Sequence, residues 1–217
     1  MGYRSVEAVV RHVLVFPLAY LLGAFPTGYL LGRALAGVDV RRLGSGRTGG
    51  SNVLRSAGTV PAALTVLGDG LKGGLAVLLA RLMGGTPLAL AIAGVAVILG
   101  HNYSVFLGWD GGAGTATAIG AALFINPLVG AAAIVVGVAT TALSRYASLA
   151  SIAVAVALPI LYAVGAVWGK MPAIYCLYAV LTGLIIIVEL RQNIGRLLAG
   201  TERKIGQPIG VAKVVGE

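Results

Sequence analysis

Charged side chains are scarce in this sequence. Aspartate, glutamate, lysine and arginine together make up 11% of the 217 residues, and only seven residues are acidic. Hydrophobic residues make up 58%, and the mean hydropathy is +0.95. Because soluble domains carry about 25% charged residues, this composition excludes an ordinary soluble domain and places the chain in a membrane.

Other absences exclude several kinds of chemistry. The single cysteine, Cys176, cannot form an internal disulfide, and the apolar run around it indicates a small packing residue. The sequence has no metal-ligand cluster, no Walker loop and no Ser-His-Asp order. No repeat of about 20 to 50 residues supports a solenoid or an inverted-repeat transporter. Any catalysis must therefore depend on positioning and electrostatics, and we expect no metal and no other cofactor.

Long apolar segments are abundant, and a helix needs about 20 such residues to cross a bilayer. The segment 115–143 is too long for one plain span, and it contains Asn126-Pro127, where proline removes a backbone donor and disfavours helical geometry in the preceding residue. Splitting it there predicts an all-α integral membrane protein that forms a single polytopic membrane domain over residues 1–217. Its seven expected transmembrane helices, one of them short, are 13–35, 59–83, 86–107, 115–125, 128–143, 147–168 and 172–189.

Basic residues divide unevenly between the two sides of this arrangement, with Lys72 inside a span. Eleven lie on one side: Arg33, Arg41, Arg42, Arg47, Arg55, Arg145, Arg191, Arg196, Arg203, Lys204 and Lys213. Four lie on the other: Arg4, Arg11, Arg81 and Lys170. Because loops rich in lysine and arginine stay in the cytoplasm, we expect the carboxyl terminus to be cytoplasmic and the amino terminus to face outward. The basic residues form short clusters between spans, so we expect no nucleic-acid partner.

Small residues recur inside the predicted spans. Examples are "GYLLG" at 28–32 and "GLKGG" at 70–74, among 33 glycines in all. Small surfaces allow helices to approach closely in lipid, where hydrophobicity does not drive association. We therefore expect most of these glycines to serve close packing.

We predict that three polar segments meet on the side of the membrane that carries the eleven basic residues. They are 41–55, 100–114 and 190–204, and 144–148 is a fourth. The first reads "RRLGSGRTGGSNVLR". Its glycines allow successive N–H groups to turn toward an anion, and arginine matches phosphate in geometry and sign. We predict a cradle for a phosphate monoester, built from Gly44, Ser45, Gly46, Arg47, Gly49, Gly50, Ser51, Asn52 and Arg55. A loop that only fixes topology would explain the arginines but not the interleaved glycine, serine and asparagine.

Polar residues in two other places have both a structural and a functional interpretation. Asp69 and Lys72 are three residues apart inside a span, so they share a helical face and form either a structural pair or part of a water-filled site. His101 can act as acid, base or donor, or it can be a hydrogen-bonded structural residue. Gly111, Gly112 and Gly114 form a second turn suited to an anion, which leads into a helix whose amino end adds a favourable dipole.

Four ordered stretches identify a family resemblance that covers almost the whole chain. They are "LGSGRTGGSNVLRSAG", "DGLKGG", "GHNYSVFLGWDGGAGTATA" and "RQNIGRLLAGTERKIG". Together they resemble the bacterial acyl-phosphate:glycerol-3-phosphate acyltransferases. The resemblance implies a multi-pass enzyme of the bacterial plasma (inner) membrane with seven helices and an active site facing the cytoplasm. It implies transfer of a fatty acyl group from acyl phosphate to glycerol 3-phosphate, giving lysophosphatidic acid and phosphate without acyl-CoA, acyl carrier protein or a metal.

The resemblance also carries over residue by residue. Ser45 and Arg55 match residues that contact substrate, and Ser148 or Ser151 matches a serine in the fifth loop. The expected catalytic residues are His101, Ser45, Arg55 and Asn193. The expected substrate-binding residues, including the two glycine turns, are Gly44, Gly46, Arg47, Asn52, Asp69, Lys72, Gly111, Gly112, Gly114, Ser148 and Arg191. The expected partners are acyl phosphate, glycerol 3-phosphate and the lipid bilayer, bound by a monomer.

Three positions depart from the family pattern. Where this chain has Arg47, Ala113 and Leu190, the family usually has asparagine, lysine and histidine, in that order. Losing the lysine removes a cation for phosphate, and a charged hydrogen bond contributes about 1.5 to 3 kcal/mol. Arg47 is a new cation nearby, whereas nothing in the sequence replaces the histidine. Two alternatives follow: a catalytically weakened or inactive paralogue that binds a phosphorylated lipid or a partner, and a transporter of lipids or small anions, in which the four stretches would have no evident purpose.

Overall fold

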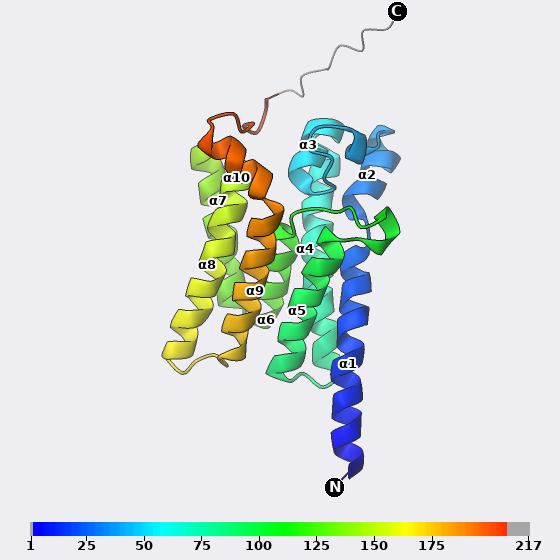
Figure 1. Ribbon diagram of the computed structural model, residues 1–217, viewed down its shortest axis with the longest axis vertical. Helices are drawn as coiled ribbons and strands as arrows, with labels where there is room; N and C mark the ends of the chain where they lie inside the picture. The colour runs from blue at the N-terminus through cyan, green and yellow to red at the C-terminus, as the bar shows by residue number, and fades with distance from the viewer. Residues whose placement is uncertain (1, 208–217) are drawn as a thin grey trace, which may run out of the picture.

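A computed structural model describes the backbone of residues 2–207 and the side chains of residues 12–207 (Figure 1). Lys213 and the side chains of Arg4 and Arg11, used in the charge comparison, lie outside these ranges. All regular secondary structure in the described part is helical. The α-helices are α1 (Gly2–Ala24), α2 (Thr27–Ala36), α3 (Gly50–Ala57), α4 (Thr59–Leu82), α5 (Pro87–Asn102), α6 (Thr115–Ile125), α7 (Pro127–Ser144), α8 (Ala147–Val167), α9 (Ile174–Glu189) and α10 (Arg191–Leu198). Two short 3-10 helices are η1 (Val40–Arg42) and η2 (Val105–Leu107).

The length and composition of these helices agree with a membrane protein. Five helical stretches are long and apolar enough to cross a bilayer, or six if α9 and α10, which are bent by 63° at Leu190, form one span. The apolar helix α6 is shorter, at 11 residues. The all-α integral membrane class predicted from the sequence is thus confirmed.

Two of the spans begin in the same way, with a capping side chain followed by proline. The Asn126 side chain accepts hydrogen bonds from the N–H groups of Leu128 and Val129, and Pro127 occupies the first turn of α7. Thr86 caps α5 in the same manner, ahead of Pro87. Proline is tolerated there because the first-turn N–H groups have no partner within the helix. The predicted break at Asn126-Pro127 is confirmed.

The first apolar stretch is one candidate span, His12–Ala36, as predicted, but its helix is interrupted. The helix stops at Ala24 and resumes at Thr27 because Pro26 has no N–H to donate. The backbone carbonyls left at the break find side-chain donors, since Ser104 Oγ donates to Ala24 O at 2.6 Å and Lys72 Nζ donates to Phe25 O at 3.1 Å. Both donors come from distant parts of the chain, so the break is part of the tertiary structure.

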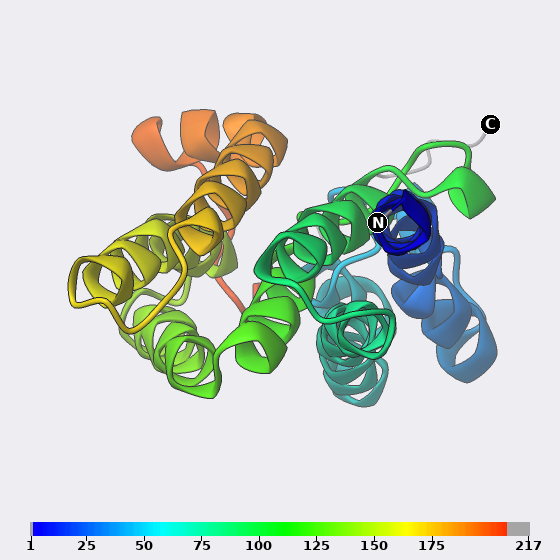
Figure 2. The ribbon, with the colours of Figure 1, turned by 90° about the horizontal axis from the view of Figure 1, so that it is seen from below.

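The helices form two groups that meet along α5 and α6, as the view from below shows (Figure 2). In one group α5 packs on α1 and α4, and in the other α7, α8 and α9 pack in sequence. Glycines permit close crossings between helices: a Cβ at Gly100 would collide with the carbonyl of Tyr20, and one at Gly73 with that of Thr117. Gly73 belongs to the "GLKGG" stretch, so its expected packing role is confirmed.

Polar segments gather at one end of the bundle. Figure 1 shows α2, α3 and α10 at the end opposite the amino terminus. The first polar segment is not all loop, because 50–57 forms α3, and 191–198 of the third segment forms α10. These two short helices are far more polar than the spans.

Candidate active site

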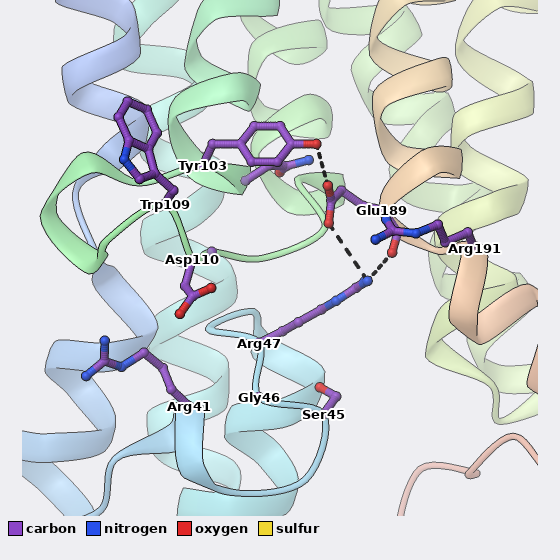
Figure 3. Close-up of a pocket in the computed structure, with 11 residues that line it drawn as sticks. Arg41, Ser45, Gly46, Arg47, Tyr103, Trp109, Asp110, Glu189 and Arg191 are labelled. Carbon is purple, nitrogen blue, oxygen red and sulfur yellow. Dashed lines mark hydrogen bonds and ion pairs between the residues drawn. The ribbon is translucent and has the colours of Figure 1, made fainter.

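Two cavities occupy the polar end. The first, of about 490 Å³, draws on all three polar segments: its lining is Arg41, Ser45, Gly46, Arg47, Asn102, Tyr103, Trp109, Asp110, Gly111, Glu189 and Arg191 (Figure 3). The second, of about 220 Å³, is lined by Gly44, Ser45, Arg47, Arg55, Gln192, Asn193, Arg196, Glu202 and Arg203. Segments far apart in the sequence therefore meet as expected. The two cavities share Ser45 and Arg47.

The loop before α3 is held in place by Asn52. This side chain is 2% exposed, and its Nδ2 donates to the carbonyls of Val40, Leu43 and Arg47 at 2.8 to 3.1 Å. Its Oδ1 accepts from the N–H of Ser45 at 2.9 Å. Asn52 lines neither cavity, so its place differs from the expected contact with substrate. It shapes the loop that carries Ser45 and Arg47.

The glycines of the first segment serve two purposes. Gly44 and Gly46 have φ of +62° and +74°, which L side chains rarely adopt, so the turn around Ser45 needs glycine. Gly50 instead lies in α3, where a Cβ would collide with the side chain of Val66 on α4. Only the first pair fits the predicted conformational role.

The second glycine turn lies directly on His101. A Cβ at Gly112 would collide with the imidazole Nε2 of His101, and one at Gly111 with the His101 carbonyl. The N–H of Gly112 donates to that carbonyl at 3.1 Å. His101 is 6% exposed and lines neither cavity, because the turn covers it. Only Gly111 of this turn reaches the first cavity, while Gly114 begins α6 with φ of +82°.

Asp69, Lys72 and His101 form one buried ionic cluster. Lys72 Nζ lies 2.9 Å from Asp69 Oδ1, and His101 Nδ1 lies 3.5 Å from the same oxygen. The Asp69 and Lys72 side chains are 3% and 8% exposed, and neither residue lines a cavity. Since Lys72 also binds the carbonyl of Phe25, the cluster joins the break after α1, the middle of α4 and the end of α5. The structural pair, one of the two interpretations of the sequence, agrees with this placement.

Arg55 carries the clearest sign of an anion site. It lines the second cavity, and its Nε is buried with no hydrogen-bond partner among the described residues. Burial lowers the pKa of the Arg55 guanidinium, and nearby Arg203 and Arg196 add to this effect, against the opposing influence of Glu202. A buried polar group without a partner is rare in proteins, and an anionic ligand would supply one.

Glu202 binds three side chains, two of which line the second cavity. Its carboxylate accepts from Ser148 Oγ at 2.9 Å, from Asn193 Nδ2 at 2.7 Å and from Arg196 Nε at 2.7 Å. Ser148 is 6% exposed and lines no cavity, whereas Asn193 lines the second one. Glu202 thereby ties the segment after α10 to α8 and orients Asn193.

Low pH is expected to weaken this connection. Burial alone would raise the pKa of Glu202, but the hydrogen bonds from Asn193, Arg196 and Ser148 outweigh it and hold the pKa below the ordinary value of 4.5. A carboxylate with a depressed pKa stabilises the fold fully above its unfolded-state pKa and loses that contribution as the pH falls through the folded-state pKa. The thermal unfolding midpoint of the wild type should therefore fall below pH 4.5 more steeply than that of Glu202→Gln. Equal slopes for the two proteins in detergent would contradict the assignment.

Sequence reasoning missed several residues of the site. Glu189 and Glu202 were not predicted, nor were Asn102, Tyr103, Trp109 and Asp110, all of which line a cavity. One signal was available for the acids: with only seven acidic residues in the chain, an acid inside a cationic segment is conspicuous. Asn102 is 3% exposed and neither amide atom has a partner in the described part, so it adds a second unsatisfied polar group.

Comparisons with known proteins identify the family. The glycerol-3-phosphate acyltransferase family model matches residues 13–200. Glycerol-3-phosphate acyltransferase 2 of Moorella thermoacetica is 44% identical over 90% of this chain and 98% of its own, and the Rubrobacter xylanophilus enzyme is 44% identical over 89% and 95%. The crystal structure of PlsY (YgiH), an integral membrane glycerol 3-phosphate acyltransferase, is similar in its glycerol 3-phosphate form, with a TM-score of 0.81 and 35% identity over 90% of this chain and 96% of that one. Its lysophosphatidic acid form gives a TM-score of 0.79 at 34% identity, over 90% and 95% of the two chains. The chain belongs to the glycerol-3-phosphate acyltransferase family.

Proposed function

We propose that this chain transfers a fatty acyl group from acyl phosphate to glycerol 3-phosphate, releasing lysophosphatidic acid and inorganic phosphate. The observation that carries this proposal is Arg55, a half-buried arginine whose buried Nε has no hydrogen-bond partner among the described residues, in a cavity lined by one acid and three further arginines. Such a cavity favours a phosphorylated ligand. The two solved structures of PlsY (YgiH), its glycerol 3-phosphate form and its lysophosphatidic acid form, support the acceptor and the product.

The proposed reaction is a direct transfer within a complex of both substrates. Arg55, Ser45 and Asn193 anchor the phosphates beside each other. An acceptor hydroxyl attacks the acyl carbonyl, forming the new ester bond. The bond between the carbonyl carbon and the phosphate oxygen breaks, and the leaving phosphate takes the proton. Proximity and stabilisation of the developing charge by arginine supply most of the rate, and no acyl-enzyme forms.

The remaining predicted site residues receive positioning roles in this proposal. Asn52 shapes the loop of Ser45, and Ser148 acts through Glu202 on Asn193. His101 packs directly against the glycine turn, and it also contacts Asp69, the partner of Lys72. Gly44 and Gly46 permit the turn around Ser45, while Gly111 and Arg191 line the first cavity. No metal or other cofactor has a part in the reaction.

We also propose the arrangement in the membrane. Counting α9 with α10 as one span and adding the short α6 brings the spans to seven. The end that holds both cavities carries most of the basic residues, so it faces the cytoplasm of a bacterial inner membrane. The polar substrates enter there, and the acyl chain lies between helices in the bilayer. One chain holds the whole site, so the enzyme works as a monomer.

A substrate assay tests the proposed function. Purified protein in detergent, supplied with acyl phosphate and labelled glycerol 3-phosphate, should form labelled lysophosphatidate. Acyl-CoA and acyl carrier protein loaded with the same fatty acid are matched control donors and should give no product. The proposal fails if acyl phosphate gives no product; binding of glycerol 3-phosphate without turnover would then favour the inactive paralogue.

The inactive paralogue remains a second candidate because of Leu190. This side chain is 4% exposed and packs in the apolar core at the bend between α9 and α10, where the family usually has histidine. A paralogue would bind glycerol 3-phosphate without turnover. Restoring the family residues with Ala113→Lys and Leu190→His should then raise activity from near zero, and a wild-type rate as high as that of the double variant would exclude this candidate.

A further inference from the structure

Arg47 has a position that no other cation shares in the described part of the chain, because it lines both cavities. Its side chain extends from the loop before α3 across to the end of α9 (Figure 3). The loop itself is fixed against the second glycine turn, since Thr48 N donates to Gly111 O at 3.1 Å. Arg47 therefore lies close to the turn in which Ala113 stands where the family usually has lysine.

Glu189, the last residue of α9, contacts the Arg47 guanidinium. Arg47 Nη2 donates to the backbone carbonyl of Glu189 and lies 3.9 Å from its carboxylate Oε2. The other carboxylate oxygen accepts from Tyr103 Oη at 2.6 Å, and Tyr20 of α1 in turn donates to the Tyr103 carbonyl at 2.6 Å. This chain of contacts joins α1, the end of α5, the end of α9 and the loop before α3.

The contacts to Glu189 use only Nη2 of the guanidinium. Arginine has five N–H donors in a rigid fork, so those on Nε and Nη1 are left for ligands. The side chain is 22% exposed, which leaves it accessible from the cavities. A fixed cation between two cavities can bind an anion in each and reduce the repulsion between them.

We propose that Glu189, supported by Tyr103, is a positioning residue that holds Arg47 between the two cavities, so that one guanidinium binds the phosphates of both substrates. This inference rests on the proposed function. It specifies how the site accommodates two anions although Ala113 stands where the family usually has lysine. Arg47 becomes a substrate-binding residue for donor and acceptor alike, and Glu189 acts through it.

Kinetics of single and double variants test this inference. Arg47→Met should raise the KM for both acyl phosphate and glycerol 3-phosphate by about tenfold or more. Glu189→Gln keeps the hydrogen bond to the backbone carbonyl but removes the ion pair with the carboxylate, so it should raise both KM values by a smaller factor, although it removes a negative charge. Electrostatics alone predicts the opposite sign, since losing an acid beside an anion site strengthens anion binding. The double variant should be no worse than Arg47→Met, because Glu189 acts only through Arg47.

Two further variants guard against misfolding and general charge effects. Tyr103→Phe removes one hydrogen bond to Glu189 and should raise both KM values by a smaller factor. Arg33→Gln removes a half-exposed arginine outside both cavities, whose nearest acid is Asp39 at 3.5 Å, and should leave both KM values unchanged. The inference is overturned if Glu189→Gln lowers either KM, if only one KM responds to Arg47→Met, or if the effects of the two changes add.

Direct binding separates this inference from the proposed function. Calorimetric titration with glycerol 3-phosphate alone needs no turnover; Arg47→Met should weaken binding by about tenfold, and Glu189→Gln should weaken it by a smaller factor. A wild type that binds but does not react would defeat the proposed function and leave the positioning role in place. A wild type that does not bind would defeat both.

Discussion

Arg55→Gln is expected to lower kcat/KM by about 100-fold to 1,000-fold. The guanidinium of Arg55 has an unpartnered buried Nε in the second cavity, so its donors are available to a phosphate. Charged hydrogen bonds contribute about 1.5 to 3 kcal/mol each, and removing one donor from a stabilised transition state typically costs about 100-fold to 1,000-fold in rate. Steady-state kinetics with acyl phosphate and glycerol 3-phosphate would measure the loss.

Two comparisons make the Arg55 result specific. Arg55→Lys keeps the charge but loses the forked geometry, so it should recover only part of the activity. Arg42→Gln removes an arginine that is 84% exposed at the same end of the molecule, and its kinetics should match the wild type. Thermal stability of Arg55→Gln should be unchanged or higher, because a half-buried charge whose Nε lacks a hydrogen-bond partner is removed. A loss of activity smaller than about threefold would contradict the assignment.

Lys72→Met is expected to destabilise the protein by about 3 kcal/mol or more. The change leaves the Asp69 carboxylate buried beside only His101 and removes the donor to the Phe25 carbonyl at the helix break. Removing one member of a buried ion pair typically costs about 3 to 5 kcal/mol because the other charge is left uncompensated. Equilibrium unfolding in detergent would measure the effect.

The partner charge provides the control for Lys72. Asp69→Asn combined with Lys72→Met removes both charges and should recover part of the lost stability. Lys170→Met changes an exposed lysine at the other end of the bundle and should have no effect. Wild-type stability in Lys72→Met would show that the pair does not hold the break. A large fall in kcat without a loss of stability would instead indicate direct contact with substrate.

Much of the fold could be predicted from the sequence because lipid imposes simple requirements. Apolar length gives the spans, and the Asn126-Pro127 pair both breaks a helix and caps the next one. Pro26 was the harder case, since Pro17 and Pro159 lie inside intact helices. A proline can end a helix where the backbone carbonyls that lose their partners within the helix find other hydrogen-bond donors. At Pro26 those donors, Ser104 and Lys72, come from parts of the chain that no local pattern connects to it.

The site was predictable at the level of segments and less so at the level of side chains. Residue type and glycine spacing located the segments that meet around the two cavities. They could not show that His101 lies beneath Gly112, or that Asn52 uses its amide on the backbone of its own loop. The bridge from Arg47 to Glu189 joins residues 142 positions apart, and the one from Ser148 to Glu202 joins residues 54 apart. Such pairs become visible only once the helices are packed.

Direct acyl transfer between two phosphorylated substrates fixes the stoichiometry of the two products. Lysophosphatidate and inorganic phosphate should be measured together, with and without glycerol 3-phosphate, at enzyme concentrations high enough to detect a single turnover. Direct transfer should give equal amounts of both products with the acceptor, and no enzyme-dependent phosphate without it. A burst of phosphate equal to the enzyme concentration in the absence of acceptor would indicate a covalent acyl-enzyme and exclude direct transfer.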